Sequence, residues 1–266
     1  MPISALGLAL ASAFVHATWN LLIARERDTH AVTAAAMLTG VVVLAPFAAA
    51  TWRVQAAAVP YIAASAAFEL AYFALLALAY ARADLSAVYP LARGSAPVLV
   101  LVGSVIALGS SASVAQVAGV LLVGVGVIAV RGRQRGGGLW LALGVGACIA
   151  GYTIVDKQGI RHAAPLAYLE LVLLVPAIVY ALAVRRRLRP ALRTRAPLAG
   201  VGMIGAYGLT LAALRLAAPA PVAAVRETSV VIGVALGALF LHERVGAARY
   251  AGAVAIAAGI AAIAAG

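Results

Sequence analysis

Charge is scarce in this sequence, and cysteine is almost absent. Only 11% of the 266 residues are charged and 65% are apolar, whereas soluble domains are about 25% charged and about 45–50% apolar. A soluble domain of this size cannot bury so much apolar surface, so we exclude a soluble enzyme, a DNA-binding domain and a disordered chain. The single cysteine, Cys148, excludes an internal disulfide and a CxxC metal site.

Motifs that power or catalyse reactions are also missing. The sequence has no GxxxxGK[ST] phosphate loop, no HExxH motif and no paired His/Cys ligands. We therefore expect no metal and no cofactor, and neither an ATP-driven pump nor a zinc protease. A membrane-embedded enzyme that uses His16, Glu69 and tyrosines for acid–base work is an alternative of another class. No nucleophile–base spacing supports it, so we do not expect an enzyme.

Long apolar runs are what the sequence has in abundance. A membrane-spanning helix needs about 20 mostly apolar residues, and these runs are too evenly apolar for barrel strands. The first run keeps His16 and Asn20 near its end, which favours a retained helix over a signal peptide. Ten runs tile the chain, at residues 3–23, 31–51, 60–80, 87–108, 114–130, 139–155, 165–184, 197–215, 221–241 and 247–264. The sequence predicts an all-α integral membrane protein with ten transmembrane helices.

The two halves of the chain match each other. Arginine is scarce inside membrane spans, so arginine matches between the halves indicate a duplication. A shift by half of the 266 residues pairs Arg82 with Arg215, Arg93 with Arg226, Gly119 with Gly252 and Gly126 with Gly259. We therefore expect one five-helix repeat in residues 1–133 and a second in residues 134–266. Because five is odd, the second repeat inserts upside down, as in many secondary transporters.

Basic residues gather in alternate loops. The loops after the odd-numbered runs hold Arg25, Arg27, Arg82, Arg131, Arg133, Arg135, Arg185, Arg186, Arg187, Arg189, Arg193, Arg195, Arg244 and Arg249. The loops after the even-numbered runs hold only Arg53, Lys157, Arg161 and Arg215. By the positive-inside rule the odd loops are cytoplasmic and both termini lie outside a plasma membrane of the bacterial inner-membrane type. The basic loops, which account for the net charge of +12, then lie beside anionic lipid. No nucleic-acid partner is therefore expected.

Arg93 and Arg226 are the most informative residues, because they lie at matching offsets in the fourth and ninth runs. An arginine stays charged, so inside a span it needs a carboxylate, a substrate anion or water. We expect the pair to flank a central site and to bind an anionic group. The alternative is neutralisation of Arg93 by Glu69, and of Arg226 by Glu170 or Glu227. Adjacent residues do not share a helix face, which argues against a bridge between Arg226 and Glu227.

Prolines flank both arginines. Each proline removes a backbone hydrogen bond and favours a kink. The candidate hinge residues are Pro90, Pro97, Pro219 and Pro221.

Polar residues in the first and third runs extend this site. Ser12, His16 and Asn20 are spaced by four and share a helix face, with Trp19 beside it. They predict a cavity-lining stripe or, alternatively, a hydrogen-bonded stripe that joins helices. Glu69 lies near the middle of the third run, and a carboxylic acid there can carry a proton. We expect Glu69 or His16 to couple transport to protons. The remaining expected substrate contacts are Trp19, Asn20, Tyr72, Tyr89 and Glu227.

Small residues predict close helix packing near the C-terminus. Gly233 and Gly237 form a GxxxG motif, and Ala251, Ala255 and Gly259 repeat every four residues. Such faces suit packing inside the chain or contact with a second copy, so a homodimer is left open.

Several segments of the chain together form a recognisable pattern. They are His16-Ala-Thr-Trp19-Asn20, the segment from Ala81 to Pro97, Pro221-Val-Ala-Ala-Val-Arg-Glu227, Leu239-Phe-Leu-His-Glu243-Arg, and the helix with Gly252 and Gly259. They resemble the drug/metabolite transporter superfamily, and specifically EamA-type transporters with two five-helix repeats, and the resemblance covers nearly the whole chain. The sequence departs from that pattern at His242, where a glycine is usual, and at Gly109-Ser110, where Gly-Glu is typical.

This resemblance implies a central cavity lined by runs one to four and six to nine, and the export or exchange of small metabolites. Together with the arginines, it predicts a secondary transporter of amino acids or organic anions that works by alternating access. A flippase for a lipid-linked or amphipathic molecule is the alternative within transport. The expected partners are a small-molecule substrate and the lipid bilayer.

Overall fold

The computed structural model describes residues 1–24, 26–82, 85–131, 139–232, 235 and 246–265. For some of these, including residues 80–82 and 85–91, only the backbone is described. The described part is helical apart from one isolated β-bridge between Val54 and Ala163. The predicted all-α class is confirmed.

The first half forms five long helices close to the predicted runs. Asp28 caps the second of them, where its Oδ1 accepts a hydrogen bond from the Ala31 N–H at 3.1 Å. The fourth ends before Gly109, whose φ of 60° is a left-handed conformation that glycine adopts without strain. The helices are α1 (Ile3–Ala24), α2 (Thr29–Ala50), α3 (Val59–Arg82), α4 (Leu85–Leu108) and α5 (Val114–Arg131), and the 3-10 turn η1 (Ala56–Ala58) precedes α3.

The second half departs from the predicted runs at three places. Its first helix continues past residue 155 to Gly159, and the arginine-rich connection contains a short helix that we did not expect. The ninth run is interrupted. The helices are α6 (Leu139–Gly159), α7 (Pro165–Ala183), α8 (Arg185–Ala191), α9 (Ala196–Leu216), α10 (Pro219–Arg226) and α12 (Ala247–Ala265).

The interruption of the ninth run falls at Glu227. Pro219 and Pro221 lie in the first turn of α10, where a missing N–H costs nothing. α10 ends at Arg226, Glu227 forms a turn, and helix resumes at Thr228. The Thr228 Oγ1 donates a hydrogen bond back to the Val225 carbonyl at 2.6 Å. Gly233, Gly237 and Glu243 lie outside the described residues.

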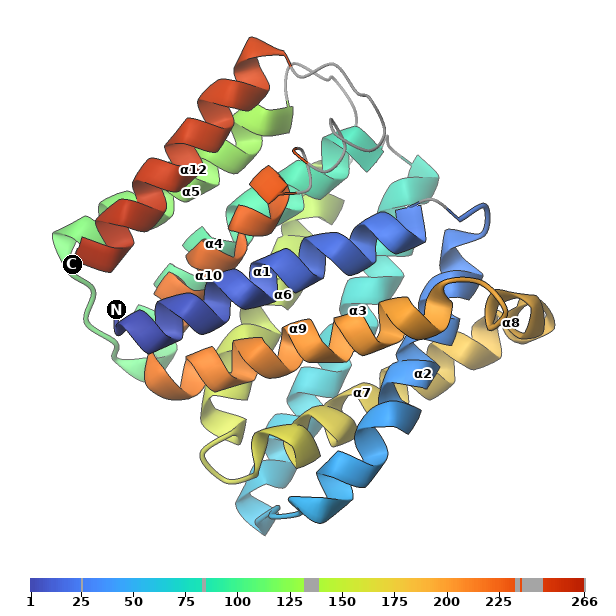
Figure 1. The fold of residues 1–266 in the computed structure, drawn as a ribbon. Helices are drawn as coiled ribbons and strands as arrows, with labels where there is room; N and C mark the ends of the chain where they lie inside the picture. Colours follow the sequence, from blue (N-terminus) through green and yellow to red (C-terminus); the bar gives the residue numbers. More distant parts are fainter. Residues whose placement is uncertain (25, 83–84, 132–138, 233–234, 236–245, 266) are drawn as a thin grey trace.

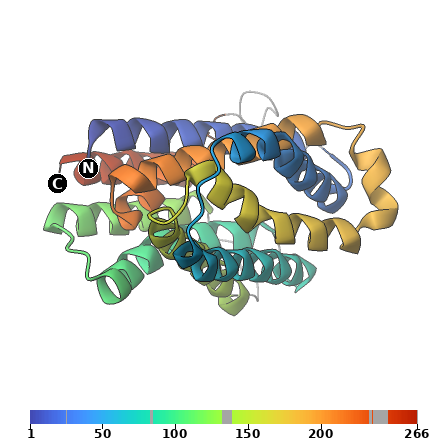
Figure 2. The same cartoon turned by 90° about the horizontal axis from the view of Figure 1, so that it is seen from below.

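The two halves are interleaved rather than side by side. Helix α1 packs along α9, and α3 packs along α6, so the first helix of each half lies against the other half (Figure 1). Helices α5 and α12 form a separate pair, and the two chain termini lie near each other. The view from below places α1 and α9 on one face of the molecule and α3 on the opposite face (Figure 2).

Glycines set the spacing between α5 and α12. A Cβ on Gly119 would lie 2.6 Å from the Gly259 carbonyl oxygen, and one on Gly126 would lie 2.8 Å from that of Gly252. The backbones therefore approach more closely than any larger residue permits. Gly259 is thus used for packing inside the chain.

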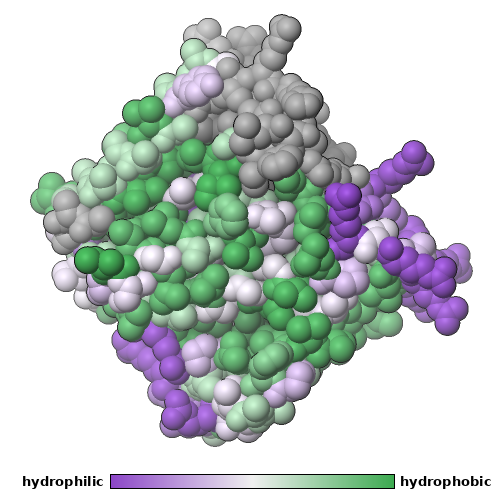
Figure 3. Space-filling view, in the orientation of Figure 1, coloured by the Kyte–Doolittle hydropathy of each residue, from purple (hydrophilic) through white to green (hydrophobic). Residues whose placement is uncertain are grey.

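The face of the molecule seen in Figure 3 is mostly apolar, as its green area shows. Polar residues gather at its ends, most densely at the end that carries α8. By length and composition, α1, α2, α7, α9 and the segment 56–76 are each suited to cross a membrane. Shorter apolar helices add to these at residues 92–108, 114–129 and 250–263. The chain is a multi-pass membrane protein.

Candidate functional site

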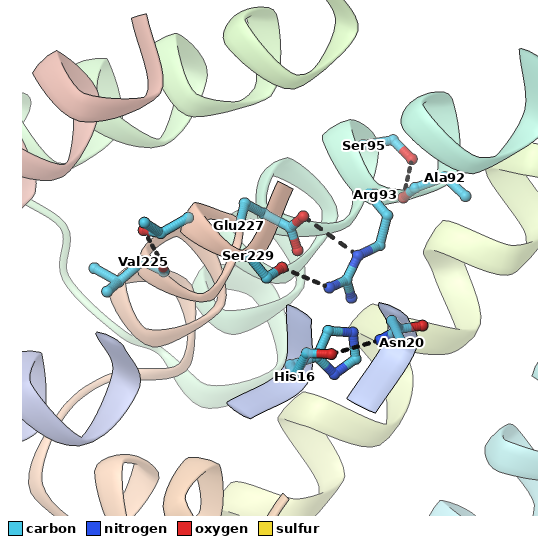
Figure 4. Close-up of polar contacts among 9 residues, drawn as sticks. His16, Asn20, Ala92, Arg93, Ser95, Val225, Glu227 and Ser229 are labelled. Carbon is cyan, nitrogen blue, oxygen red and sulfur yellow. Dashed lines mark hydrogen bonds and ion pairs between the residues drawn. The ribbon is translucent and has the colours of Figure 1, made fainter. Parts of the chain in front are cut away.

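Arg93 joins the two halves at the centre of the molecule. It lies on α4 and is 6% exposed. Its Nε lies 3.4 Å from Glu227 Oε2, and its Nη2 donates a hydrogen bond to Ser229 Oγ at 3.2 Å. Figure 4 shows this side chain reaching from α4 to the turn that follows α10. The predicted alternative of neutralisation by a carboxylate therefore applies to Arg93, but the partner is Glu227 rather than Glu69.

Arg226 is held differently from its sequence counterpart. It is 9% exposed, and its Nε has no hydrogen-bond partner. Among the residues that the structure describes, its guanidinium forms no hydrogen bond and no ion pair. Arg226 and Glu227 point in different directions because adjacent helical residues do not share a face. A buried guanidinium that no carboxylate contacts directly is costly in a folded protein, which makes Arg226 the strongest candidate for a ligand contact.

Titratable groups surround Arg226 on several helices. Its charge acts on His16 of α1, Glu69 of α3, Tyr152 and Asp156 of α6, and Glu227. We call these residues, with Arg93 and Tyr207, the central polar cluster. It brings together five of the predicted site residues from distant parts of the chain, namely His16, Glu69, Arg93, Arg226 and Glu227.

The polar stripe of α1 divides between the two roles that the sequence left open. Ser12 is fully buried, donates to the Ala206 carbonyl at 2.7 Å and lies 2.9 Å from Thr210 Oγ1, so it joins α1 to α9. His16 instead lies beneath the guanidinium of Arg93 in Figure 4, and the charges of both arginines act on it.

Asn20 and Trp19 stay close to His16. The Asn20 Nδ2 donates to the His16 carbonyl at 2.8 Å, which is a bond within α1. The Trp19 ring meets the His16 ring edge-on, with 4.9 Å between centroids. Its Nε1 is buried and has no acceptor among the described residues. The indole N–H is thus a second donor that this region leaves unused.

The sequence-based reasoning missed Asp156, a second buried acid. Asp156 is 1% exposed on α6 and accepts three hydroxyl hydrogen bonds. Ser65 and Tyr168 donate to its Oδ1 at 2.6 and 2.9 Å, and Tyr207 donates to its Oδ2 at 2.6 Å. Tyr207 also lies beside Glu69, so one phenol lies next to both acids. The spacing of Tyr152 and Asp156 by four was the available signal, because it places both on one helix face.

The other predicted contacts lie around this cluster or outside the described side chains. Tyr72 packs its ring against Phe73 at 5.0 Å and borders the apolar cluster that contains Tyr152. Pro97 lies within α4, which continues through it without interruption. The side chains of Tyr89 and Pro90 lie outside what the structure describes. Among the described residues, no group of three His, Cys, Asp or Glu side chains is placed to hold a metal ion.

Comparison with known proteins finds a family match within the second half of the chain. The model of the EamA-like transporter family matches residues 136–265. A solved structure titled "Crystal structure of protein" has the same fold, with a TM-score of 0.79 at 16% sequence identity. The match covers 98% of this chain and 96% of that one. No curated protein matches the sequence.

Proposed function

We propose that this chain, whose residues 136–265 form an EamA-like transporter domain, is a secondary transporter of small anionic metabolites, among them amino acids or organic anions. Membership of that family implies membrane transport, and its members are generally not enzymes. The observation that carries the anionic substrate is the buried guanidinium of Arg226, which makes no ion pair and no hydrogen bond among the described residues. A bound carboxylate would supply that direct partner through charge-assisted hydrogen bonds.

The surroundings of Arg226 fit a small amphipathic solute. Tyr152 and Tyr207 lie with their ring centroids 6.0 Å apart next to the acids, and His16 and Trp19 lie on α1, which packs along α9. Binding sites for small molecules combine such apolar walls with a few convergent polar groups. In our proposal Arg226 holds the anionic group, and Trp19, Tyr72 and Tyr89 pack the apolar part.

Packing supports two inverted repeats, residues 1–133 and 134–266. A two-fold axis relates contacts in pairs. If one residue contacts the counterpart of a second residue in the other repeat, then the second residue contacts the counterpart of the first. The glycines of α5 and α12 obey this rule. Gly119 and Gly126 match Gly252 and Gly259 in sequence, and in space Gly119 meets Gly259 while Gly126 meets Gly252. The pairings of α1 with α9 and of α6 with α3 are related in the same way. Alternating access would follow from rocking of one repeat against the other.

Charge placement supports termini outside the cell. The α8 arginines lie at the end of the molecule opposite the N-terminus. At the other end, Lys157 and Arg215 bind backbone carbonyls, so fewer free cations face the lipid there. By the positive-inside rule, α8 is cytoplasmic in a bacterial inner-membrane type of bilayer.

Proton coupling through Glu69 or His16 belongs to the same proposal. Glu69 is 6% exposed beside Tyr207 and within the field of Arg226. A carboxyl group in this position can exchange a proton as the halves rock. Glu69→Gln removes the exchange while keeping the size of the side chain. We expect uptake driven by an imposed pH gradient to fail in this variant, and unchanged uptake would reject the role.

The substrate is sought with a thermal-shift screen of the purified chain against amino acids, organic acids and phosphonates, with cationic drugs as the opposite charge class. A ligand that binds only the folded state stabilises it by mass action. We expect anions to raise the melting temperature of the wild type and not of Arg226→Ala.

Arg187→Ala is the matched control. Arg187 pairs with Asp28 at 2.9 Å on the surface, with its side chain 56% exposed. This variant should respond to anions as the wild type does. Equal stabilisation of Arg226→Ala and the wild type by the same anions, or a response to cations alone, would refute an anion site at Arg226.

A further inference from the structure

We propose that the Glu227 carboxylate is an internal occupant of the anion site, which an incoming substrate anion displaces from Arg93. The inference rests on the proposed function and adds to it a competitor built into the chain. It concerns the empty protein, in which some group must balance the buried guanidinium charge.

The contact between Glu227 and Arg93 suits an exchangeable partner. Glu227 is 3% exposed, and its Oε2 lies 3.4 Å from Arg93 Nε. The same oxygen has no hydrogen-bond partner among the described residues. Permanent arginine–carboxylate pairs in protein interiors are often bidentate and satisfy both oxygens. A substrate carboxylate that offers two well-placed oxygens to a guanidinium can therefore replace Glu227.

The charges around Glu227 explain why it would compete with an anion. Arg93 from α4 contacts it directly, and the charge of Arg226 from α10 also acts on it. The same two arginine charges act on His16 of α1. The charge of Arg226 also acts on Glu69 and Asp156, and Tyr152 and Tyr207 lie beside those acids. The side chains described on α5 and α12 bring no further charge to it. An anion that approaches Arg226 thus meets the like charge of Glu227, which repels it.

The position of Glu227 in the backbone allows the exchange. It forms the turn between α10 and the helix that resumes at Thr228, and its N–H bonds to the Ala224 carbonyl at 3.1 Å. A side chain at such a break can swing with a small change of backbone angles. Because Arg93 belongs to the first half and Glu227 to the second, displacement also removes a tie between the halves. Binding of an anion would in this way shift the equilibrium between different relative positions of the two halves.

The test compares Glu227→Gln with the wild type as purified full-length protein. Acetate, L-glutamate and inorganic phosphate are the probes, and isothermal titration calorimetry measures their dissociation constants. Glutamine keeps the size of the side chain but loses the charge. We expect the variant to bind any probe that the wild type binds about tenfold more tightly, a gain of about 1.4 kcal/mol. Glu227→Asp, whose shorter carboxylate does not reach Arg93, should show a smaller gain.

The outcomes separate this inference from the proposed function. A purely structural Glu227 predicts weaker binding and a lower melting temperature in Glu227→Gln, so equal or weaker binding by folded Glu227→Gln and Glu227→Asp overturns the inference. Glu170→Gln is the matched control and should leave the affinities unchanged, since Glu170 lies on α7 and no charged group of the cluster acts on it. If Arg226→Ala binds the probes as well as the wild type does, or none binds either protein, the proposed function fails, and the inference fails with it.

Discussion

Arg93 and Arg226 hold equivalent positions in the sequence and different positions in the network of charges. Glu227 follows Arg226 in the chain but contacts Arg93 of the other half. The sequence could indicate that these side chains belong to one site, because buried charges are rare and these are matched. It could not indicate the pairs, since pairing depends on how the halves are set against each other.

Asp156 shows a different limit of sequence-based prediction. Asp156 is followed by Lys157. A pair of charged residues at the end of an apolar run indicates the beginning of a loop. In the structure α6 continues to Gly159, and Asp156 faces three hydroxyl donors from α3, α7 and α9. Those donors lie 91, 12 and 51 residues away in the chain, so no local pattern could have predicted them.

We predict that Asp156 stabilises the fold as an acceptor shared by three helices. Asp156→Ala leaves the hydroxyls of Ser65, Tyr168 and Tyr207 buried without their acceptor. The expected loss is about 3 kcal/mol or more in the free energy of unfolding, because each orphaned buried group costs about 1–3 kcal/mol. Titration of the purified protein with a denaturing detergent measures it.

Ser65→Ala is the matched control for Asp156. It removes a single donor and leaves the carboxylate two others, so we expect the free energy of unfolding to fall by about 1 kcal/mol. Equal losses for the two variants would show that Asp156 is not the shared acceptor.

At the scale of the helices, the ends of α6 and α9 hold each other. The Lys157 ammonium of α6 binds the Leu214 and Ala217 carbonyls at the end of α9. The Arg215 guanidinium of α9 binds the Ile160 and Ala163 carbonyls just past α6, at 3.3 and 3.2 Å. Each cation thus satisfies carbonyls that a helix end leaves without partners and opposes the negative end of the dipole.

We predict that Lys157→Met lowers the free energy of unfolding by about 1–2 kcal/mol, because methionine keeps the apolar stem and loses the bonds to carbonyls. Arg187→Met, which breaks an exposed pair with Asp28, should cost well under 1 kcal/mol. The same detergent titration compares them. A larger loss for Arg187→Met than for Lys157→Met would contradict the role of Lys157 as a helix cap.

The close pair of α5 and α12 gives a second prediction at this scale. In Gly119→Ala the added Cβ meets the Gly259 carbonyl at 2.6 Å, so the helices must separate. We expect the free energy of unfolding to fall by about 1–3 kcal/mol, as for other overpacked contacts. Gly7→Ala on α1 has no atom within 4 Å of the new Cβ and should be neutral or slightly stabilising. Equal melting temperatures of the two variants would refute the close packing.

Helix boundaries illustrate what the sequence determines at this scale. Continuous apolar runs predicted α1, α2, α7 and α9 to within two residues. The break at Glu227 was not predicted, because the apolar run through residues 221–241 contains no proline or glycine at that point. Tertiary contacts of the Glu227 carboxylate with α4 accompany this break.

At the scale of the whole molecule, the orientation in the membrane follows from charge. We predict that both termini lie outside and the α8 arginines inside. Epitope tags on either terminus should be accessible in intact spheroplasts, whereas trypsin should cleave between Arg185 and Arg195 only in inside-out vesicles. The reverse pattern of accessibility would show that the positive-inside rule does not decide the orientation of this protein.

The central claim concerns the unpaired charge at the middle of the molecule. Crystals of the protein grown with bromide, an anion that is located by its anomalous scattering, test it directly. We expect a bromide peak in contact with the Arg226 guanidinium, and none there in crystals of Arg226→Ala. Bromide bound only along the arginines of α8, with a protein carboxylate in direct contact with the Arg226 guanidinium, would contradict the account.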